Sequence, residues 1–354
     1  MTRLPRLARA PLALAAGLLL ATSVAACSGA SANSGSGKDS TAPTLRLGYF
    51  ANVTHATPVV GVGKGFYPKR LGKTQLKTQI FNAGPAAVEA MLSGSLDAAY
   101  LGPNPAINAW AKTHNVRIIA GATTGGASLV VKPNIGSAAD LKGRRLADPQ
   151  LGGTQDVALR NWLAGKGLKP DSDVKLAAGT DNATTLQLFQ QGQIDGAWVP
   201  EPWASRLVLD GGGKVLVDER TLWPGGKFVT THLLVNTSFL NKYPKTVKAL
   251  LQGQVDTNDW IAAHPADAKA TVNAQLKQLT GKSLTAAALD RAWGNITITN
   301  DPDAQSLNVS AKHAEKAKLL DHVDLKGIYD LRPLNDVLGA AGKPKVKAAG
   351  LGKE

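Results

Sequence analysis

Short apolar stretches alternate along this chain with longer segments in which apolar residues recur at helical spacing. The stretches LRLGYF (45–50), LDAAYL (96–101) and IDGAWV (194–199) are bounded by glycine, asparagine or proline, which predicts strands. A helical pattern follows each of them. Strands that alternate with helices along a chain predict mainly parallel sheets flanked by helices, and therefore an α/β fold.

The same order of features occurs twice, as a weak internal repeat. SGSLDAAYLGP (93–103) aligns with QGQIDGAWVPE (191–201), with one aspartate and one aromatic residue at matching places. GVGKGFY (61–67) resembles LAGKGLK (163–169), and each lies at the expected end of a helix. A repeat of this kind predicts two similar α/β lobes in one chain, with a ligand held between them.

Two further strand-like stretches, 126–132 and 227–236, are suited to connect the lobes. The C-terminal third is mostly helical in pattern, and we expect it to return to the first lobe. Its last residues are rich in lysine and glycine, which favours fraying. The predicted division is lobe I at 44–127 together with 233–342, lobe II at 128–232, and a tail at 343–354.

The N-terminal segment is typical of an export signal. Three arginines precede an apolar run at 12–20, and small residues follow as far as Cys27. That run is too short to span a bilayer as a mature helix, so we predict a signal peptide at 1–26. The sequence VAAC resembles a bacterial lipobox, in which Cys27 carries lipid such as palmitate; an uncleaved anchor or a free thiol are the alternatives. Residues 27–43 are rich in glycine and serine, which predicts a flexible tether.

The charge balance is strongly basic, with a formal net charge of +14. Such a balance is compatible with nucleic acid, an anionic membrane surface or an anionic ligand. The lysines are spread along the whole chain with few aromatic residues among them, so we expect solvated lysines and no nucleic-acid binding. Cys27 is the single cysteine of the sequence, which excludes an intrachain disulfide.

Catalytic and metal-binding motifs are not found in the sequence. A phosphate loop at GVGKG fails, because Pro58 stands where the first glycine is required and Gly65 follows Lys64. The six histidines form neither H-E-x-x-H nor a close pair, so we predict no metal, cofactor or catalytic residue. Asp97 and Asp195 match each other in the repeat, and we favour a local structural role for them over a pair of catalytic carboxylates.

Polar or proline-marked helix starts follow several of the predicted strands. In open α/β sheets ligands bind at the carboxyl ends of strands, and a helix N-terminus there favours an anion. Pro105 suits the first turn of a helix, and Asn104 is a favoured N-cap type. The predicted ligand-binding residues are Asn52, Thr54, His55, Gly84, Asn104, Thr154, Gln155 and Glu201.

Some neighbouring residues have two possible roles. Asp156 is expected to pair with Arg160 four residues later, which leaves Thr154 and Gln155 to face the ligand. His55 and His232 lie on cleft-side or hinge stretches, where each suits ligand contact or packing equally. Tyr100, Trp198 and Trp203 form either a wall of the cleft or part of the core.

Several stretches together resemble the solute-binding lipoproteins of ABC importers for aliphatic sulfonates, nitrate and taurine. The most informative are AGPAAVEAMLSGSLDAAYLGPNPAI (83–107), DLKGRRLADPQLGGTQDVALRNWL (140–163) and QGQIDGAWVPEPWASRL (191–207). The resemblance implies a two-lobe periplasmic-binding-protein-like fold of type II, each lobe a mainly parallel sheet flanked by helices, with the ligand in the cleft. It implies no catalytic activity and no cofactor.

The resemblance also implies a monomer that delivers its ligand to a membrane permease driven by a cytoplasmic ATPase. Such a protein is anchored by its lipid to the outer face of the cell membrane, on the periplasmic side where an outer membrane exists. An aliphatic sulfonate is the ligand we expect. Nitrate, taurine or a thiamine precursor are alternatives within the same fold, and an extracytoplasmic enzyme is a more distant one.

Overall fold

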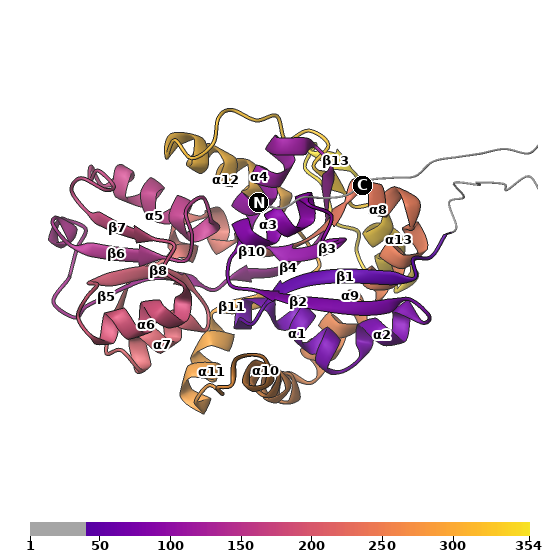
Figure 1. The fold of residues 1–354 in the computed structure, drawn as a ribbon, viewed down its shortest axis with the longest axis horizontal. Coiled ribbons are helices and arrows are strands. Elements are labelled where there is room, and N and C mark those ends of the chain that lie inside the picture. The colour runs from indigo at the N-terminus through magenta and orange to yellow at the C-terminus, as the bar shows by residue number, and fades with distance from the viewer. Residues whose placement is uncertain (1–39) are drawn as a thin grey trace, which may run out of the picture. The chain divides into compact units, whose positions relative to one another are not determined.

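The computed structural model describes residues 40–354. The predicted signal peptide, the lipidation site Cys27 and nearly all of the predicted tether lie outside the described residues. Within the described part the chain forms two sheets with helices on both faces (Figure 1). The prediction of an α/β fold is confirmed.

The sheet of lobe I is the larger one. Its strands lie in the order β13-β12-β4-β10-β3-β1-β2, and β11 pairs with β4. β1, β2 and β3 are parallel to one another, whereas β10 runs antiparallel to both β3 and β4. The bounds are β1 Thr44–Phe50, β2 Gln75–Phe81, β3 Ala98–Leu101, β4 Val116–Gly125, β10 Val229–Asn236, β11 Ile296–Ile298, β12 Tyr329–Asp330 and β13 Gly352–Lys353.

The sheet of lobe II repeats the central part of this arrangement. Its order is β7-β6-β8-β5-β9, in which β6, β7 and β8 are parallel and β5 runs antiparallel to β8. The order β7-β6-β8-β5 therefore matches β2-β1-β3-β10 of lobe I, and the predicted internal repeat is confirmed. The bounds are β5 Ala127–Val131, β6 Arg145–Asp148, β7 Lys175–Ala178, β8 Gly196–Pro200 and β9 Lys214–Asp218.

Helices cover both faces of each sheet because side chains alternate along the strands. In lobe I, Leu47 and Tyr49 of β1 join the core under α1, α9 and α10, whereas Phe50 joins the core under α3 and α4. In lobe II, Trp198 of β8 packs on the α5 side and Val199 on the side of α6 and α7. The helices are α1 Ala56–Gly63, α2 Phe66–Leu71, α3 Gly84–Leu92, α4 Pro103–Thr113, α5 Thr154–Gly165, α6 Asn182–Gln190, α7 Trp203–Leu209, α8 Thr237–Lys242, α9 Pro244–Ala263, α10 Pro265–Thr280, α11 Ala286–Gly294, α12 Ala304–Lys316 and α13 Arg332–Ala340.

Two of the predicted boundaries need correction. Val229 and His232 of β10 pair with Thr124 and Gly121 of β4, so the chain has already returned to lobe I at residue 229 and not at 233. Residues 343–354 are not a frayed tail, because β13 pairs with β12 and Leu351 accepts backbone hydrogen bonds from Gly327 and Tyr329. Both differences arise from pairing with strands that are distant in the sequence.

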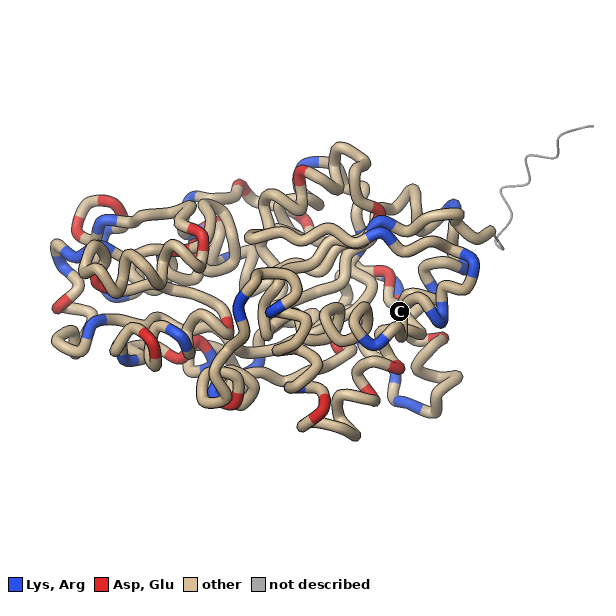
Figure 2. Tube along the Cα trace, turned by 60° about the horizontal axis from the view of Figure 1, so that its bottom comes forward, with Lys and Arg blue, Asp and Glu red and all other residues tan. Residues whose placement is uncertain are grey.

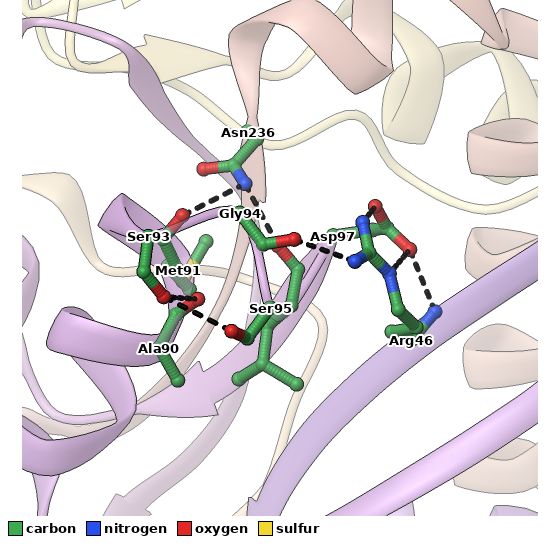
Figure 3. Close-up of polar contacts among 9 residues, drawn as sticks. Arg46, Ala90, Met91, Ser93, Gly94, Ser95, Asp97 and Asn236 are labelled. Carbon is green, nitrogen blue, oxygen red and sulfur yellow. Dashed lines mark hydrogen bonds and ion pairs between the residues drawn. The ribbon is translucent and has the colours of Figure 1, made fainter. Parts of the chain in front are cut away.

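The repeat extends to its turns and its aspartates. Gly65 after α1 and Gly167 after α5 have the same left-handed φ of 76°, as expected for glycine beyond a helix end. Asp97 Oδ2 accepts hydrogen bonds from Arg46 N at 2.8 Å and Arg46 Nε at 2.9 Å (Figure 3). Asp195 Oδ2 accepts one from Arg145 N at 2.9 Å. Asp97 thus ties β1 to the turn before β3, and Asp195 ties β6 to the turn before β8, which confirms the structural interpretation.

The basic residues are distributed over both lobes and lie among acidic ones (Figure 2). Basic residues that are spread along the sequence are therefore also spread over the folded protein. Among residues 40–354, no helix has the length and apolar character needed to cross a membrane.

Candidate ligand cleft

Six helices begin next to the carboxyl ends of parallel strands. α1, α3 and α4 follow β1, β2 and β3 in lobe I, and α5, α6 and α7 follow β6, β7 and β8 in lobe II. All of the helix starts that the sequence predicted are present. These ends are where ligands bind in open α/β sheets, so the candidate cleft lies where the two sets of helix starts approach each other.

The starts of α4 and α5 are in direct contact across the lobes. A Cβ atom added to Gly102, the residue before α4, would lie 2.3 Å from Thr154 Oγ1, in the first residue of α5. No side chain caps either helix, so backbone N–H groups of both first turns are left without a capping acceptor. Thr154 is buried and its Oγ1 has no hydrogen-bond partner. Two helix N-termini, each with a partial positive charge, therefore meet here beside a hydroxyl group that has no hydrogen-bond partner.

The predicted capping role of Asn104 is wrong. α4 begins at Pro103 with Gly102 as its N-cap, so Asn104 is already the second residue of the helix. Its Nδ2 donates a hydrogen bond to the Ser310 carbonyl in α12 at 3.2 Å. Pro103 suits the first helical position as well as Pro105 does. The helix therefore begins two residues closer to the N-terminus than predicted. The side chain of Asn104 thus anchors α4 to α12.

Gly84 is the first residue of α3 and is needed for close packing. A Cβ atom at this position would lie 2.2 Å from Cγ of Pro105 in α4. A larger residue would push α3 away from α4. Gly84 therefore sets the position of two helix starts in lobe I, whether or not its backbone contacts a ligand.

Asn52 and Thr54 face lobe II from the segment between β1 and α1. Asn52 Oδ1 accepts a hydrogen bond from Trp203 Nε1 of lobe II at 3.0 Å. The Thr54 carbonyl accepts one from Thr231 Oγ1 at 3.0 Å, which holds this segment against β10. The bond between Asn52 and Trp203 thus joins the two lobes.

His55 and His232 are both buried in lobe I. The ring of His55 stacks on Phe50 with centroids 4.4 Å apart. Burial lowers the pKa of His55 to about 3, against a smaller opposing effect of the Tyr100 backbone. Burial likewise lowers the pKa of His232 to about 4, and its Nε2 lies 3.1 Å from the Pro302 carbonyl. Both rings are neutral at pH 7, so neither supplies a positive charge to an anion.

Glu201, one of the predicted ligand-binding residues, makes hydrogen bonds within the protein. Its carboxylate accepts hydrogen bonds from Ser205 N and Oγ, both at 3.0 Å, and from Asn295 Nδ2 of lobe I at 2.7 Å. Burial raises the pKa of Glu201, and these hydrogen bonds oppose the shift. The carboxylate accepts hydrogen bonds from donors of both lobes, so Glu201 helps to hold the lobes together.

Asp156 pairs with Arg160 as expected, with Oδ1 2.6 Å from Arg160 Nε. Its Oδ2 accepts a hydrogen bond from Gly152 N at 2.8 Å. Gln155 is partly exposed at the start of α5. A second carboxyl, Asp148 at the end of β6, is fully buried beside Asp156, and burial together with this negative neighbour raises the pKa of Asp148 to about 7. No local pattern in the sequence marks Asp148, because only the packing of α5 on β6 buries it.

Of the three aromatic residues considered for the cleft wall, two belong to the core. Tyr100 is buried and its hydroxyl bonds to Tyr67 and Gln254 within lobe I. Trp198 is buried and its Nε1 donates to Glu219 at 2.8 Å. Trp203 alone of the three bridges the lobes. Within residues 40–354, no three His, Cys, Asp or Glu side chains gather in a way that could hold a metal ion.

Comparison with known proteins places this geometry in a family. The sequence model described as the NMT1-like family matches residues 38–276. The chain belongs to the NMT1-like family. The taurine-binding periplasmic protein of Escherichia coli is 30% identical over 190 residues, which cover 52% of this chain and 57% of that protein. The bicarbonate-binding protein CmpA of Synechococcus elongatus is 27% identical over 270 residues, which cover 68% of this chain and 57% of that protein.

The matched regions thus span somewhat more than half the length of these two relatives. Among solved structures, the alkanesulfonate-binding protein SsuA of Xanthomonas axonopodis pv. citri bound to MOPS has a TM-score of 0.68 and 22% identity. The match covers 80% of this chain and 96% of that one. The resemblance seen in the sequence is confirmed for the family, and the two-lobe binding-protein fold is confirmed by the structural match.

Proposed function

We propose that this protein is the extracytoplasmic solute-binding component of an ABC importer and that it binds a small organic anion between its lobes. The observation that carries the proposal is the contact of the α4 and α5 starts. Each presents uncapped N–H groups, and the hydroxyl of Thr154 stands unpartnered between the lobes. An anion placed there receives hydrogen bonds from both lobes without any cationic side chain.

An aliphatic sulfonate is the proposed ligand. Its three oxygens accept several backbone N–H groups at once, and its alkyl part needs apolar contacts of the kind that Trp203 offers. The taurine-binding and alkanesulfonate-binding proteins similar to this chain favour this choice, and the bicarbonate-binding relative makes a smaller anion the alternative. The residues proposed to surround the anion are Asn52, Thr54, His55, Gly84, Thr154, Gln155 and the first turn of α4.

The proposed cycle involves binding and no covalent chemistry. Ligand shifts the population from separated to closed lobes, and the closed form delivers it to a permease driven by a cytoplasmic ATPase. The protein acts as a monomer held at the outer face of the cell membrane by lipid on Cys27.

A thermal-shift screen of residues 41–354 tests the ligand class. The panel contains taurine, alkanesulfonates, nitrate, bicarbonate and a thiamine pyrimidine. A ligand at a hundred times its Kd stabilises the native state by about 2.7 kcal/mol. A shift with alkanesulfonates supports the proposal, and a shift with the pyrimidine alone contradicts the anion site.

A matched pair of variants tests the location. Thr154→Val removes the unpartnered hydroxyl and should weaken sulfonate binding three- to tenfold, since one hydrogen bond is lost. Thr237→Val is the control, because Thr237 Oγ1 is also a buried atom without a hydrogen-bond partner. Thr237 is the first residue of α8, directly after the C-terminal end of β10, and is not one of the residues proposed to surround the anion. Equal affinities of the two variants would place the anion elsewhere.

A further inference from the structure

A groove of about 770 Å³ lies between the lobes next to the candidate cleft. Helices α6 and α7 form its lobe II wall, and the end of α10 with the turn toward α11 forms its lobe I wall. Ala51 and Pro202 also line it. Because Ala51 precedes Asn52 and Pro202 follows Glu201, the groove lies beside the residues that join the lobes.

Apolar side chains lie on both walls of the groove, among polar ones. Leu186 and Trp203 face it from lobe II, and Leu276 and Leu284 face it from lobe I. The volume falls within the range of sites that bind drug-sized molecules. An alkyl chain or a ring in the groove would contact both lobes at once.

One cation in the groove has no partner. Arg206 lies over the Trp203 ring at 5.0 Å and pairs with Asp210 at 3.0 Å, so its charge is balanced. Lys282, on the turn after α10, is exposed, and its ammonium group makes no ion pair within residues 40–354. The charge at the lobe I side of the groove is therefore available to a ligand.

An open hydrogen-bonding position lies next to the groove, at the start of α6. Ala183 and Thr184 of α6 line the groove, and Asn182 stands directly before them. The side chain of Asn182 is 7% exposed and its Oδ1 has no partner. A buried polar atom without a partner points to a polar group or a water that is held there.

We propose that this groove is a second subsite of the ligand cleft and that the natural ligand is an elongated organic anion. Its apolar body lies against Trp203 and the leucines, and a terminal anionic group lies beside Lys282. This inference rests on the proposed function, because the first anionic group occupies the α4 and α5 starts.

Three probes of graded length test the subsite: propane-1-sulfonate, octane-1-sulfonate and octane-1,8-disulfonate. Each added methylene that leaves water strengthens binding. We expect calorimetry to give a Kd for octane-1-sulfonate at least tenfold below that for propane-1-sulfonate. The disulfonate should bind at least as tightly as octane-1-sulfonate.

Two variants at exposed positions should act on the long probes only. Lys282→Ser should raise the Kd of the disulfonate three- to tenfold and leave propane-1-sulfonate within twofold. Gln187→Trp fills the groove from the exposed side of α6 and should weaken both octane probes. Lys277→Ser is the matched control, since it removes one lysine from exposed α10 outside the groove.

The outcomes separate the two proposals. Binding of propane-1-sulfonate with no gain from length, and no effect of either variant, would overturn the subsite and leave the proposed function standing. Failure of every anion to bind the wild-type protein would overturn both.

Discussion

Trp203 Nε1 donates a hydrogen bond to Asn52 Oδ1 at 3.0 Å, and this bond joins lobe II to lobe I at the edge of the cleft. It forms only when the lobes are together, since the two residues belong to different lobes. A bond that exists in one conformation alone shifts the equilibrium toward that conformation.

Replacing this donor should therefore weaken ligand binding. Trp203→Phe keeps the ring but loses the N–H, and a neutral hydrogen bond contributes about 0.5–1.5 kcal/mol. We expect the Kd of a short ligand, propane-1-sulfonate, to rise about two- to tenfold by calorimetry. Trp260→Phe in α9 is the control, and an unchanged Kd for Trp203→Phe would show that the bond does not contribute to closure.

A second prediction concerns the contact of Gly102 with Thr154. Gly102 has φ −75°, which alanine adopts readily, but its Cβ would lie 2.3 Å from Thr154 Oγ1. Gly102→Ala should thus obstruct closure while each lobe stays folded. We expect ligand affinity to fall at least tenfold and the urea midpoint to change little.

Gly165→Ala provides the comparison for this variant. Gly165 ends α5, and a Cβ there has no heavy atom within 4 Å, so this alanine should stabilise α5 slightly and leave affinity unchanged. Full affinity of Gly102→Ala would mean that the ligand-bound lobes do not reach this contact.

The features that the sequence predicted correctly are those encoded by neighbouring residues. Proline and glycine mark the starts of α3 and α4, and the repeat aligns β3 with β8. The contacts that the sequence did not predict involve partners that are far apart in the chain. Glu201 meets Asn295, 94 positions later, and Trp203 meets Asn52, 151 positions earlier. No local pattern shows such pairs.

Two of the corrected predictions, the tail and the cap at Asn104, have the same kind of cause. β13 consists of only Gly352–Lys353 and is a strand because it pairs with β12. The sequence of these two residues by itself therefore predicts a tail. Two prolines near Asn104 allow two helix starts, and only the packing of α4 on α12 selects one of them.

The equivalent aspartates of the two lobes give a third prediction. Asp97 is more buried than Asp195, with 8% against 30% of the side chain exposed. Asp97→Asn should lower the free energy of unfolding by about 1–3 kcal/mol, because a buried acceptor of charged donors is lost (Figure 3). Asp195→Asn should cost less. Urea denaturation measures both, and a ligand Kd changed more than twofold in either would contradict a purely structural role.

The last prediction concerns Asp148, which is buried next to Asp156 under the start of α5. Burial and this negative neighbour raise the pKa of Asp148 to about 7, whereas an unfolded aspartate titrates near pH 3.9. Between these values the folded state holds a proton that the unfolded state has released, so stability falls as the pH rises from about 4 to 7. The loss is complete above the folded pKa and is on the order of 2–4 kcal/mol.

Asp148→Asn should remove this part of the pH dependence, because the amide stays neutral and can donate a hydrogen bond to Asp156. We expect the variant to be more stable than the wild type at pH 8 and no more stable at pH 4.5, by urea denaturation at both values. Burial also raises the pKa of Glu219 to about 7. The free energy of unfolding of the variant should therefore still fall somewhat between pH 4 and 7. Glu219→Gln therefore serves as the comparison, and a slope for Asp148→Asn equal to that of the wild type would show that Asp148 is ionised throughout this range.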